Sequence, residues 1–267
     1  MIKVNDIVIT PSNFPDGTLM VKFDPNQIDQ DTREIWIEWT YENDAELFTL
    51  ICIKRHLESH FYDTSYFLYL PYIPHARMDR VKKEEDVFTL KYFCEVINSL
   101  HFSAVYVCDA HSNVSLALLD NVIQEPIEEN IQTSIEMSGA EALFFPDEGA
   151  MKRYSDMATL PFAFGMKKRD WSTGQILGLD LIGAENIIGK KVLIVDDICS
   201  YGGTFAAAAR ELKAAGAGNI YMYVTHCEEN IFRGAIFEEN NITKVYTTNS
   251  IYRNTEGWVA ADKVFVL

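Results

Sequence analysis

Residues 192–212, VLIVDDICSYGGTFAAAAREL, decide the fold of this chain. The apolar, β-branched run at 192–195 predicts a buried strand of a parallel sheet. Asp196 and Asp197 follow where that strand should end, and a glycine turn then leads into a helix. The apolar side of that helix is expected to carry Phe205, Ala208, Leu212 and Ala215. Because ligands of open α/β sheets bind at the carboxyl ends of strands, this stretch predicts a ligand site.

The turn at residues 200–204, SYGGT, predicts a phosphate-binding loop. Gly202 and Gly203 would let backbone amides approach a phosphate closely, and the start of the helix offers free N–H groups to an anion. The two aspartates could hold sugar hydroxyls or a hydrated Mg²⁺. Taken singly, an aspartate pair can cap a helix and a glycine pair can form an ordinary turn. In this order and at this spacing they indicate a phosphorylated sugar.

Composition limits the class of protein. At 267 residues and 48% hydrophobic content, the chain can bury the core of one large or two modest domains. A formal charge of −16 argues against a nucleic-acid partner, although a small phosphorylated ligand needs only a local basic pocket or a metal. Five cysteines without CxxC spacing fit a reducing compartment. With no signal peptide and no long apolar run, we expect a soluble cytoplasmic protein without a membrane segment.

Strand and helix patterns follow a similar plan twice along the chain. The first half shows strands and helices at 7–9, 19–23, 35–39, 45–60, 66–72, 88–100 and 104–108. After a polar stretch the rhythm restarts, with elements at 131–137, 142–145, from 151, 160–166, 192–212, 219–225, 244–247 and 264–267. We therefore expect an α/β fold of two similar halves, residues 1–125 and 126–267, each a mostly parallel sheet flanked by helices.

Charged side chains follow the predicted strand at 66–72 in the first half. Arg77 and Arg80 flank Asp79, at a position where a rigid guanidinium fork can grip phosphate oxygens. Such a set can equally form surface ion pairs of little consequence. Its place at a strand end favours the phosphate-binding interpretation.

His111 and Asp147 each follow another predicted strand, at 104–108 and 142–145. The histidine could be a metal ligand or a proton carrier, or simply a hydrogen-bonded loop residue. Together the two side chains could hold one Mg²⁺, since this cation accepts few protein ligands and keeps waters and phosphates for the rest.

Three cations, Lys167, Lys168 and Arg169, come at the end of the predicted strand at 160–166. The glycine-containing stretch after them, residues 171–183, looks like a mobile loop. Phosphoryl or diphosphoryl transfer needs charge placed against the transferring oxygens once water is excluded. The alternative is a basic turn that aids solubility, which is harder to accept in so acidic a chain.

Taken together, these pieces resemble the ribose-phosphate diphosphokinases, which make phosphoribosyl diphosphate from ATP and ribose 5-phosphate. The matching stretches appear in family order over nearly the whole chain, at residues 14–17, 76–80, 109–111, 146–149, 167–169 and 196–204. Phosphoribosyltransferases match only the last of them. The resemblance implies two phosphoribosyltransferase-like halves, with ATP held mainly by the first and the ribose phosphate by the second.

The resemblance also implies a role for each matching residue. ATP would be bound by Arg77, Asp79 and Arg80, and the adenine of a neighbouring subunit by Phe14 and Asp16, so at least a homodimer is implied. Mg²⁺ would be held by His111 and Asp147. Catalysis would depend on Lys167, Arg169 and His111. The ribose hydroxyls would meet Asp196 and Asp197, directly or through a second metal, and the 5′-phosphate would meet Ser200, Tyr201, Gly202, Gly203 and Thr204.

In the implied reaction the ribose 1-hydroxyl attacks the β-phosphorus of ATP and releases AMP, within one cleft that both halves line. The chain departs from the family where a third aspartate and a threonine are usual in the phosphate loop, because it has Ser200 and Tyr201. It also has Thr18 for a glutamate and Met78 for a glutamine. A bulky Tyr201 leaves room for a second acceptor, ADP-ribose, which would give ADP-ribose 1-diphosphate and serve NAD salvage.

Two other classes remain open. A phosphoribosyltransferase would consume phosphoribosyl diphosphate and a base without ATP, which would leave Arg77, His111 and Lys167 without a purpose. A silent regulatory homologue would pair with an active subunit. The retained loop cations and both metal-site residues argue against a silent copy.

Overall fold

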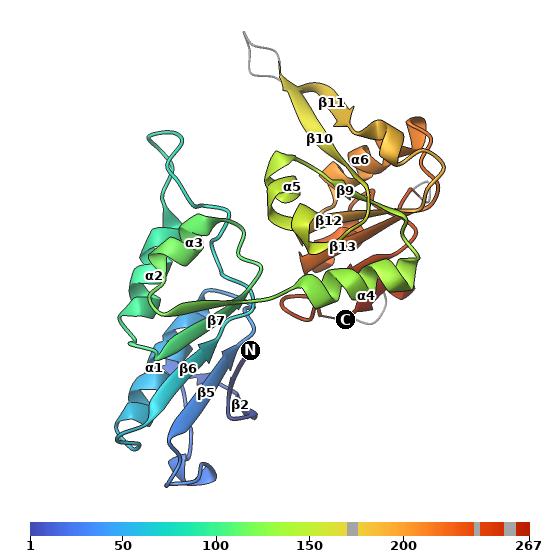
Figure 1. The fold of residues 1–267 in the computed structure, drawn as a ribbon. Helices are drawn as coiled ribbons and strands as arrows, with labels where there is room; N and C mark the ends of the chain where they lie inside the picture. The colour runs from blue at the N-terminus through green and yellow to red at the C-terminus, as the bar shows by residue number, and fades with distance from the viewer. Residues whose placement is uncertain (170–175, 238–240, 254–259) are drawn as a thin grey trace. The chain divides into compact units, whose positions relative to one another are not determined.

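The structure, a computed structural model, describes residues 1–169, 176–237, 241–253 and 260–267, and at 167–169 and 176–179 it describes the backbone alone. The chain divides into two compact units, Met1–Glu125 (unit 1) and Pro126–Leu267 (unit 2). Each unit is built around one main sheet with helices packed on it (Figure 1). The expected fold class, α/β with two mostly parallel sheets flanked by helices, is confirmed.

Unit 1 contains a six-stranded sheet in the order β2-β1-β5-β6-β7-β8. The strands are β1 (Ile2–Val4), β2 (Ile7–Ile9), β5 (Glu34–Trp39), β6 (Ser65–Tyr69), β7 (Ala104–Cys108) and β8 (Val122–Glu125). Strands β5 to β8 run parallel, while β1 is antiparallel to both its neighbours. The helices are α1 (Ala45–Glu58), α2 (Thr89–Asn98) and α3 (Asn113–Leu118), and a separate hairpin joins β3 (Ser12–Asn13) to β4 (Leu19–Met20).

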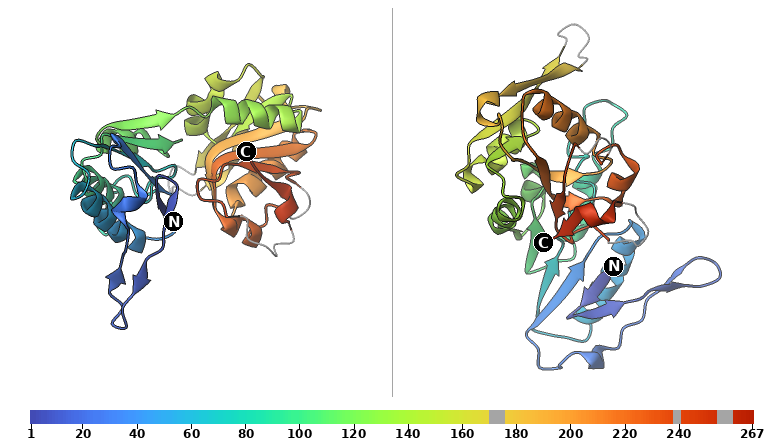
Figure 2. Two further views of the ribbon diagram at one scale, coloured as in Figure 1. Left: turned by 90° about the horizontal axis from the view of Figure 1, so that it is seen from below. Right: turned by 90° about the vertical axis from the view of Figure 1, so that its right-hand side faces the viewer.

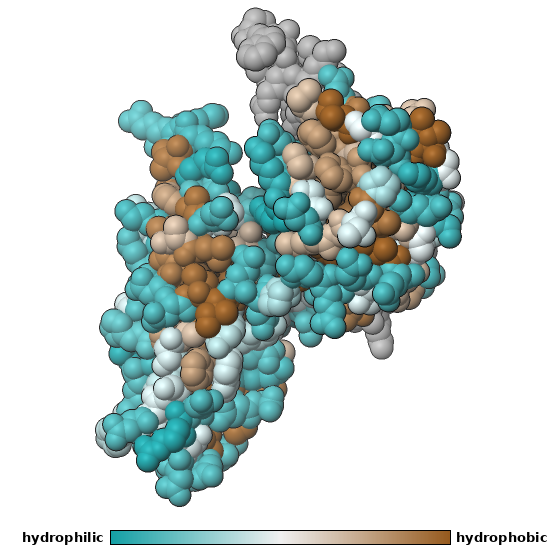
Figure 3. All heavy atoms as spheres, in the orientation of Figure 1, coloured by the Kyte–Doolittle hydropathy of each residue, from teal (hydrophilic) through white to brown (hydrophobic). Residues whose placement is uncertain are grey.

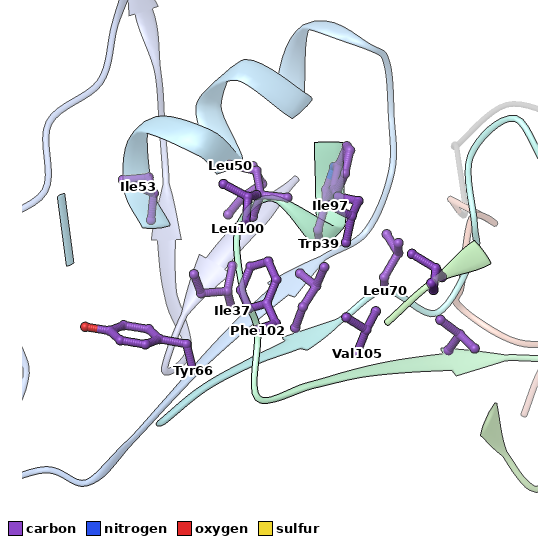
Figure 4. Close-up of a cluster of buried hydrophobic side chains, with 14 of the residues drawn as sticks. Ile37, Trp39, Leu50, Ile53, Tyr66, Leu70, Ile97, Leu100, Phe102 and Val105 are labelled. Carbon is purple, nitrogen blue, oxygen red and sulfur yellow. The ribbon is translucent and has the colours of Figure 1, made fainter. Parts of the chain in front are cut away.

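The core of unit 1 lies on one face of its sheet. Along β5, Ile35, Ile37 and Trp39 are fully buried, as the alternation of a half-covered strand requires. Figure 4 shows Ile37 and Trp39 in the same cluster as Leu50 of α1 and Ile97 of α2. The residues between them in sequence point to the other face. Unit 1 therefore has a single core, formed where α1 and α2 cover the sheet.

Unit 2 contains a seven-stranded sheet in the order β11-β10-β9-β12-β13-β14-β15. The strands are β9 (Ala142–Phe145), β10 (Phe162–Arg169), β11 (Ile176–Ile182), β12 (Val192–Cys199), β13 (Ile220–Cys227), β14 (Val245–Thr247) and β15 (Val264–Val266). Only β11 is antiparallel to its neighbour among these described strands. The helices are α4 (Glu128–Ser138), α5 (Glu148–Tyr154) and α6 (Gly203–Ala214).

Both faces of the unit 2 sheet are buried. Val192 and Ile194 of β12 pack in one cluster with α6, while Leu193 and Val195 pack in a second cluster with α4 and α5. Figure 2 shows helices on both sides of this sheet. A strand covered on both faces is apolar at every position, which explains the continuous run that the sequence shows at 192–195.

Short 3-10 helices occupy several connections in the described residues. They are Pro25–Gln27, Ser155–Met157, Ala184–Asn186, Glu229–Arg233 and Ala261–Lys263. Among the residues that the structure describes, no helix is long and apolar enough to cross a membrane.

Two element boundaries expected from the sequence are wrong. Strand β12 continues to Cys199, because β13 runs parallel beside it and pairs Ile198 with His226. Strand β10 continues to Arg169, and residues 176–182 form β11 rather than a loop. The glycines at 174 and 178 made the β10–β11 hairpin look like a loop in the sequence. Gly183 directly follows β11. Its φ is +77°, and a Cβ there would lie 2.9 Å from the Phe162 carbonyl oxygen, so this position requires glycine.

Candidate functional site

The predicted phosphate-binding loop lies between β12 and α6. Gly202 immediately precedes the helix with a φ of +74°, a left-handed conformation that favours glycine, and a Cβ there would lie 2.8 Å from Ile236 Cδ1. Gly203 has open space where a side chain would be. Tyr201 and Thr204 are exposed on either side. The first N–H groups of α6 are therefore approachable from solvent, as binding of an anion at a helix start requires.

The segment after β13 holds this loop in place. The Ser200 hydroxyl donates to Glu228 Oε2 at 2.6 Å, and the Glu228 N–H donates to the Cys199 carbonyl oxygen at 2.8 Å. Behind the loop, the backbone of Gly234 comes so close that a Cβ would lie 1.8 Å from the Tyr201 carbonyl oxygen. The conformation of the loop thus depends on residues that lie about thirty positions later in the chain.

Three carboxylates lie close together: Asp147 just after β9, and Asp196 and Asp197 in the second half of β12. Asp196 Oδ1 accepts from the Asp197 N–H at 3.0 Å. Burial and the charge of Asp197 raise the pKa of Asp196 well above its usual value, and the charge of Asp147 contributes to the same shift. This shift indicates a site with concentrated negative charge that a cation would relieve.

Helix α5 contributes to the same region. Asp147 precedes the helix, and its Oδ1 accepts from the Ala150 N–H at 3.0 Å, which fixes the carboxylate at the start of α5. Arg153, at the end of the helix, places Nη1 3.8 Å from Asp197 Oδ1. The guanidinium partly offsets the acidic pair. Sequence patterns offered no signal for Arg153, because it lies in a short helix rather than at a strand end.

In unit 1 the charged residues after β6 and β7 meet. Arg80 grips Asp79 with both arms of its fork, Nε to Oδ1 at 2.7 Å and Nη2 to Oδ2 at 2.9 Å. These bonds hold the pKa of the nearly buried Asp79 below its usual value, and the charge of His111 contributes to the shift. The structure therefore brings Asp79, Arg80 and His111 together, while Arg77 is exposed beside them.

The backbone next to the cluster of Asp79, Arg80 and His111 is strained at Asp109. Asp109 lies directly after β7 with a φ of +38°, and only 1% of the residue is exposed. A left-handed conformation is uncommon for a residue with a Cβ, and such residues gather at functional sites. The turn aims the chain from Cys108 toward His111.

Phe14 and Asp16 lie at the tip of the β3–β4 hairpin. Asp16 Oδ1 accepts from the Thr18 hydroxyl at 2.7 Å and from the Thr18 N–H at 3.0 Å, and these bonds lower the pKa of Asp16. Phe14 is 51% exposed. Thr18 thus orders the turn, and the aromatic ring is presented to solvent.

Lys167, Lys168 and Arg169 occupy the last positions of β10. Their backbones pair with β11, where Lys167 lies opposite Leu179 and Arg169 opposite Ile176. The start of the predicted mobile loop, residues 171–175, lies outside the described residues, as do the side chains of the three cations. Their catalytic role stays a prediction.

The metal prediction is likewise untested. Within the described part of the chain, no three His, Cys, Asp or Glu side chains are grouped so that they could hold a metal. His111 belongs to unit 1 and Asp147 to unit 2, so the pair remains a prediction.

Sequence reasoning missed three residues of the unit 2 site: Arg153, Glu228 and Gly234. Glu228 follows β13 directly, so the rule that selected Asp147 could have selected it too. The close approach of Gly234 to Tyr201 had no local signal, because the two residues meet only once β12 and β13 pair.

Known proteins resemble this chain at two levels. Residues 152–252 match the family model described as phosphoribosyl transferase domain. A ribose-phosphate pyrophosphokinase of Pyrococcus furiosus is 28% identical over 222 residues, which cover 80% of this chain and 75% of that protein. A ribose-phosphate pyrophosphokinase of Pyrococcus abyssi is 28% identical over 249 residues, covering 90% and 81%.

A solved structure shares the fold over almost the full length. The crystal structure of phosphoribosylpyrophosphate synthetase from Mycobacterium smegmatis matches with a TM-score of 0.75 at 19% identity, covering 97% of this chain and 85% of that one. The shared architecture extends over both units, whereas the family model matches only within unit 2.

Proposed function

We propose that this chain, a distant member of the ribose-phosphate pyrophosphokinase family, is a Mg²⁺-dependent diphosphokinase that uses ATP and a phosphorylated ribose. The acceptor is first of all ribose 5-phosphate, and the products are phosphoribosyl diphosphate and AMP. The observation that supports this most directly is the loop at 200–204, where a left-handed glycine and an open helix start follow two carboxylates. That arrangement fits a sugar phosphate, with hydroxyls on the acids and phosphate on the amides.

The two units would divide the substrates between them. Arg77 and the Asp79–Arg80 fork would hold the nucleotide, with the phosphates directed toward His111. Asp196 and Asp197 would hold the ribose hydroxyls, and the loop would hold the 5′-phosphate. In the transfer, a bond forms between the ribose O1 and the β-phosphorus, and the bond from that phosphorus to the oxygen bridging to the α-phosphorus breaks. AMP leaves with the bridging oxygen.

Mg²⁺ suits the carboxylates of unit 2. Hard oxygen donors are the ligands this cation prefers, and the raised pKa of Asp196 reflects negative charge that a cation would stabilise. Asp147 and His111 would hold the ion, which would neutralise charge on the phosphates. Lys167 and Arg169 would place positive charge against the transferring group.

A larger acceptor, ADP-ribose, is the second candidate. Tyr201 stands in the loop where the family usually has a small hydroxyl, and it is 55% exposed. An exposed aromatic ring offers a stacking surface to an adenosine carried on the 5′ side of the ribose. The product would then be ADP-ribose 1-diphosphate.

The assembly would be a homodimer or a larger homo-oligomer in the cytoplasm. Phe14 is exposed at the tip of a hairpin and Asp16 is held in a fixed turn, which suits a residue pair that reaches the adenine of a neighbouring subunit.

The deciding experiment incubates the protein with ATP, Mg²⁺ and either ribose 5-phosphate or ADP-ribose, and measures AMP. We expect AMP only when an acceptor with a free 1-hydroxyl is present. No AMP with either acceptor would refute the diphosphokinase. Consumption of phosphoribosyl diphosphate with a base, in the absence of ATP, would instead support a phosphoribosyltransferase.

A further inference from the structure

We infer that Glu228 sets the charge preference of the acceptor subsite: it positions the phosphate loop through Ser200, and its carboxylate disfavours a 5′-phosphorus that carries two charges relative to one that carries a single charge, as in a diphosphate diester. This inference rests on the proposed function, because it concerns the acceptor of that reaction.

The contacts of Glu228 make it part of the loop. Its Oε2 accepts from the Ser200 hydroxyl at 2.6 Å and from Asn230 Nδ2 at 3.2 Å. Its N–H donates to the Cys199 carbonyl oxygen at 2.8 Å, so its backbone is tied to the end of β12. The carboxylate is therefore fixed one side chain away from the loop backbone rather than being free to move away.

The half-buried position of Glu228 reduces the screening of its charge by solvent. Glu228 is half-buried, and its charge adds to burial in raising the pKa of Cys227 to about 12. A charge that acts on a buried neighbour is weakly screened. Loop residues 200–204 contain no charged side chain, and the first turn of α6 contains no acidic residue, whereas Glu228 brings a carboxylate into contact with the loop through Ser200.

The charge of the ligand is what this carboxylate would distinguish. A terminal phosphate carries about −1.5 to −2 near pH 7, since its second pKa is near 6, while a phosphodiester carries one charge per phosphorus. The diphosphate of ADP-ribose carries two charges in all, but they lie on two phosphorus atoms, and repulsion from a fixed carboxylate falls with distance, so the charge on the nearest phosphorus counts most. Glu228 would thus weaken the binding of a phosphomonoester more than the binding of a diester. Removing its charge would reduce the difference in affinity between the two ligands.

The test compares two changes at one position. Glu228→Gln keeps an oxygen that accepts from Ser200 and removes the charge, whereas Glu228→Ala removes both. Glu211→Gln, on the exposed side of α6, makes the same charge change away from the loop. KM and kcat are measured with ribose 5-phosphate and with ADP-ribose, and the affinity for ribose 5-phosphate alone is measured by calorimetry.

We expect Glu228→Gln to lower the KM for ribose 5-phosphate by roughly three- to tenfold. The KM for ADP-ribose should change less, and the KM for ATP should not change. In the wild type, the KM for ribose 5-phosphate should also fall between pH 7.5 and 5.5, because the phosphate gains a proton. In Glu228→Gln this pH dependence of the KM should be smaller. Glu228→Ala should raise the KM for both acceptors, because the loop loses its support. Glu211→Gln should match the wild type.

Two outcomes would overturn the inference. One is an unchanged or higher KM for ribose 5-phosphate in Glu228→Gln, while the wild type makes AMP. The other is an equal change in Glu211→Gln, which would indicate a general effect of net charge. If the wild type makes no AMP, the proposed function fails. The calorimetric comparison then still decides whether Glu228 weakens phosphate binding.

Discussion

The two sheets of this protein are covered differently. In unit 1, β5 buries Ile35, Ile37 and Trp39 on one face, while Trp36 on the other face is 38% exposed and stacks on Phe67 at 4.7 Å between ring centroids. In unit 2, β9 and β12 are buried on both faces. Figure 3 shows that hydrophobic side chains also reach the surface of unit 1, around α3 and β7.

This difference shows how coverage shapes the chemistry of strand ends. A strand enclosed on both faces holds its side chains in a low-dielectric environment, and burial within β12 together with the charge of Asp197 raises the pKa of Asp196. In unit 1, Asp79 lies in a loop after the strand and is paired with Arg80, and its pKa is lowered. The same residue type thus has opposite electrostatic behaviour in the two units.

The largest expected effect is at a close backbone approach in unit 2. Gly234→Ala would place a Cβ 1.8 Å from the Tyr201 carbonyl oxygen, so the backbone must move. We expect a loss of more than about 4 kcal/mol in the free energy of unfolding, measured by urea denaturation. Gly17→Ala in unit 1 meets no atom within 4 Å but keeps a φ of +86°, and it should cost only ~1 kcal/mol. Equal losses of unfolding free energy in the two variants would contradict the expected difference between these positions.

The next effect compares two phenylalanines on strands. Phe144 of β9 is fully buried, and Phe144→Ala should cost about 3–5 kcal/mol through lost packing and a cavity. Phe67 of β6 is partly exposed on the uncovered face and stacks on Trp36. We expect Phe67→Ala to cost roughly 1–2 kcal/mol, by the same denaturation measurement. A larger loss at Phe67 would mean that this face is covered in solution.

A third comparison separates the proposed roles of the units in turnover. Lys167→Ala should lower kcat by roughly 10²- to 10³-fold with little change in stability, because a cation that acts on the transferring group is lost. Arg77→Ala in unit 1 should mainly raise the KM for ATP. The exposed Lys191 is the matched cation, and Lys191→Ala should leave both constants unchanged. Normal kcat in Lys167→Ala would remove Lys167 from the mechanism.

The smallest effect is on the pH dependence of stability. The raised pKa of Asp196 means that the folded state holds its proton longer than the unfolded chain, so stability falls as pH rises from the unfolded pKa of ~3.9 to the folded value. Asp196→Asn should remove that loss and stabilise the protein at pH 7. The lowered pKa of Asp79 has the opposite effect on stability, which rises with pH. Its contribution is present above ~3.9 and is lost as pH falls through the folded pKa.

Thermal unfolding between pH 3 and pH 8 measures both variants. Asp79→Asn should be less stable than the wild type at pH 7 and approach it at the acid end. A wild-type profile that Asp196→Asn leaves unchanged would contradict the assigned pKa shift.

Much of the fold could be predicted, because the patterns were local. The run at 192–195 and the alternation at 35–39 each report how many faces of a strand are covered. The β10–β11 hairpin was missed, since the glycines between 174 and 183 resemble loop composition, and its pairing is decided by the partner strand. Asp79, His111, Asp147, Asp196 and Asp197 were predicted as site residues from their positions after predicted strands, and their roles stay predictions.

By itself, the sequence determined the class of fold, and it predicted two halves and the charged residues near the ends of their strands. Only the tertiary structure decided which of those residues touch. Glu228 meets Ser200, Arg153 approaches Asp197, and Gly234 lies against Tyr201. The physical reason is that periodicity records whether a residue is covered, while the identity of the covering group depends on which strands lie side by side.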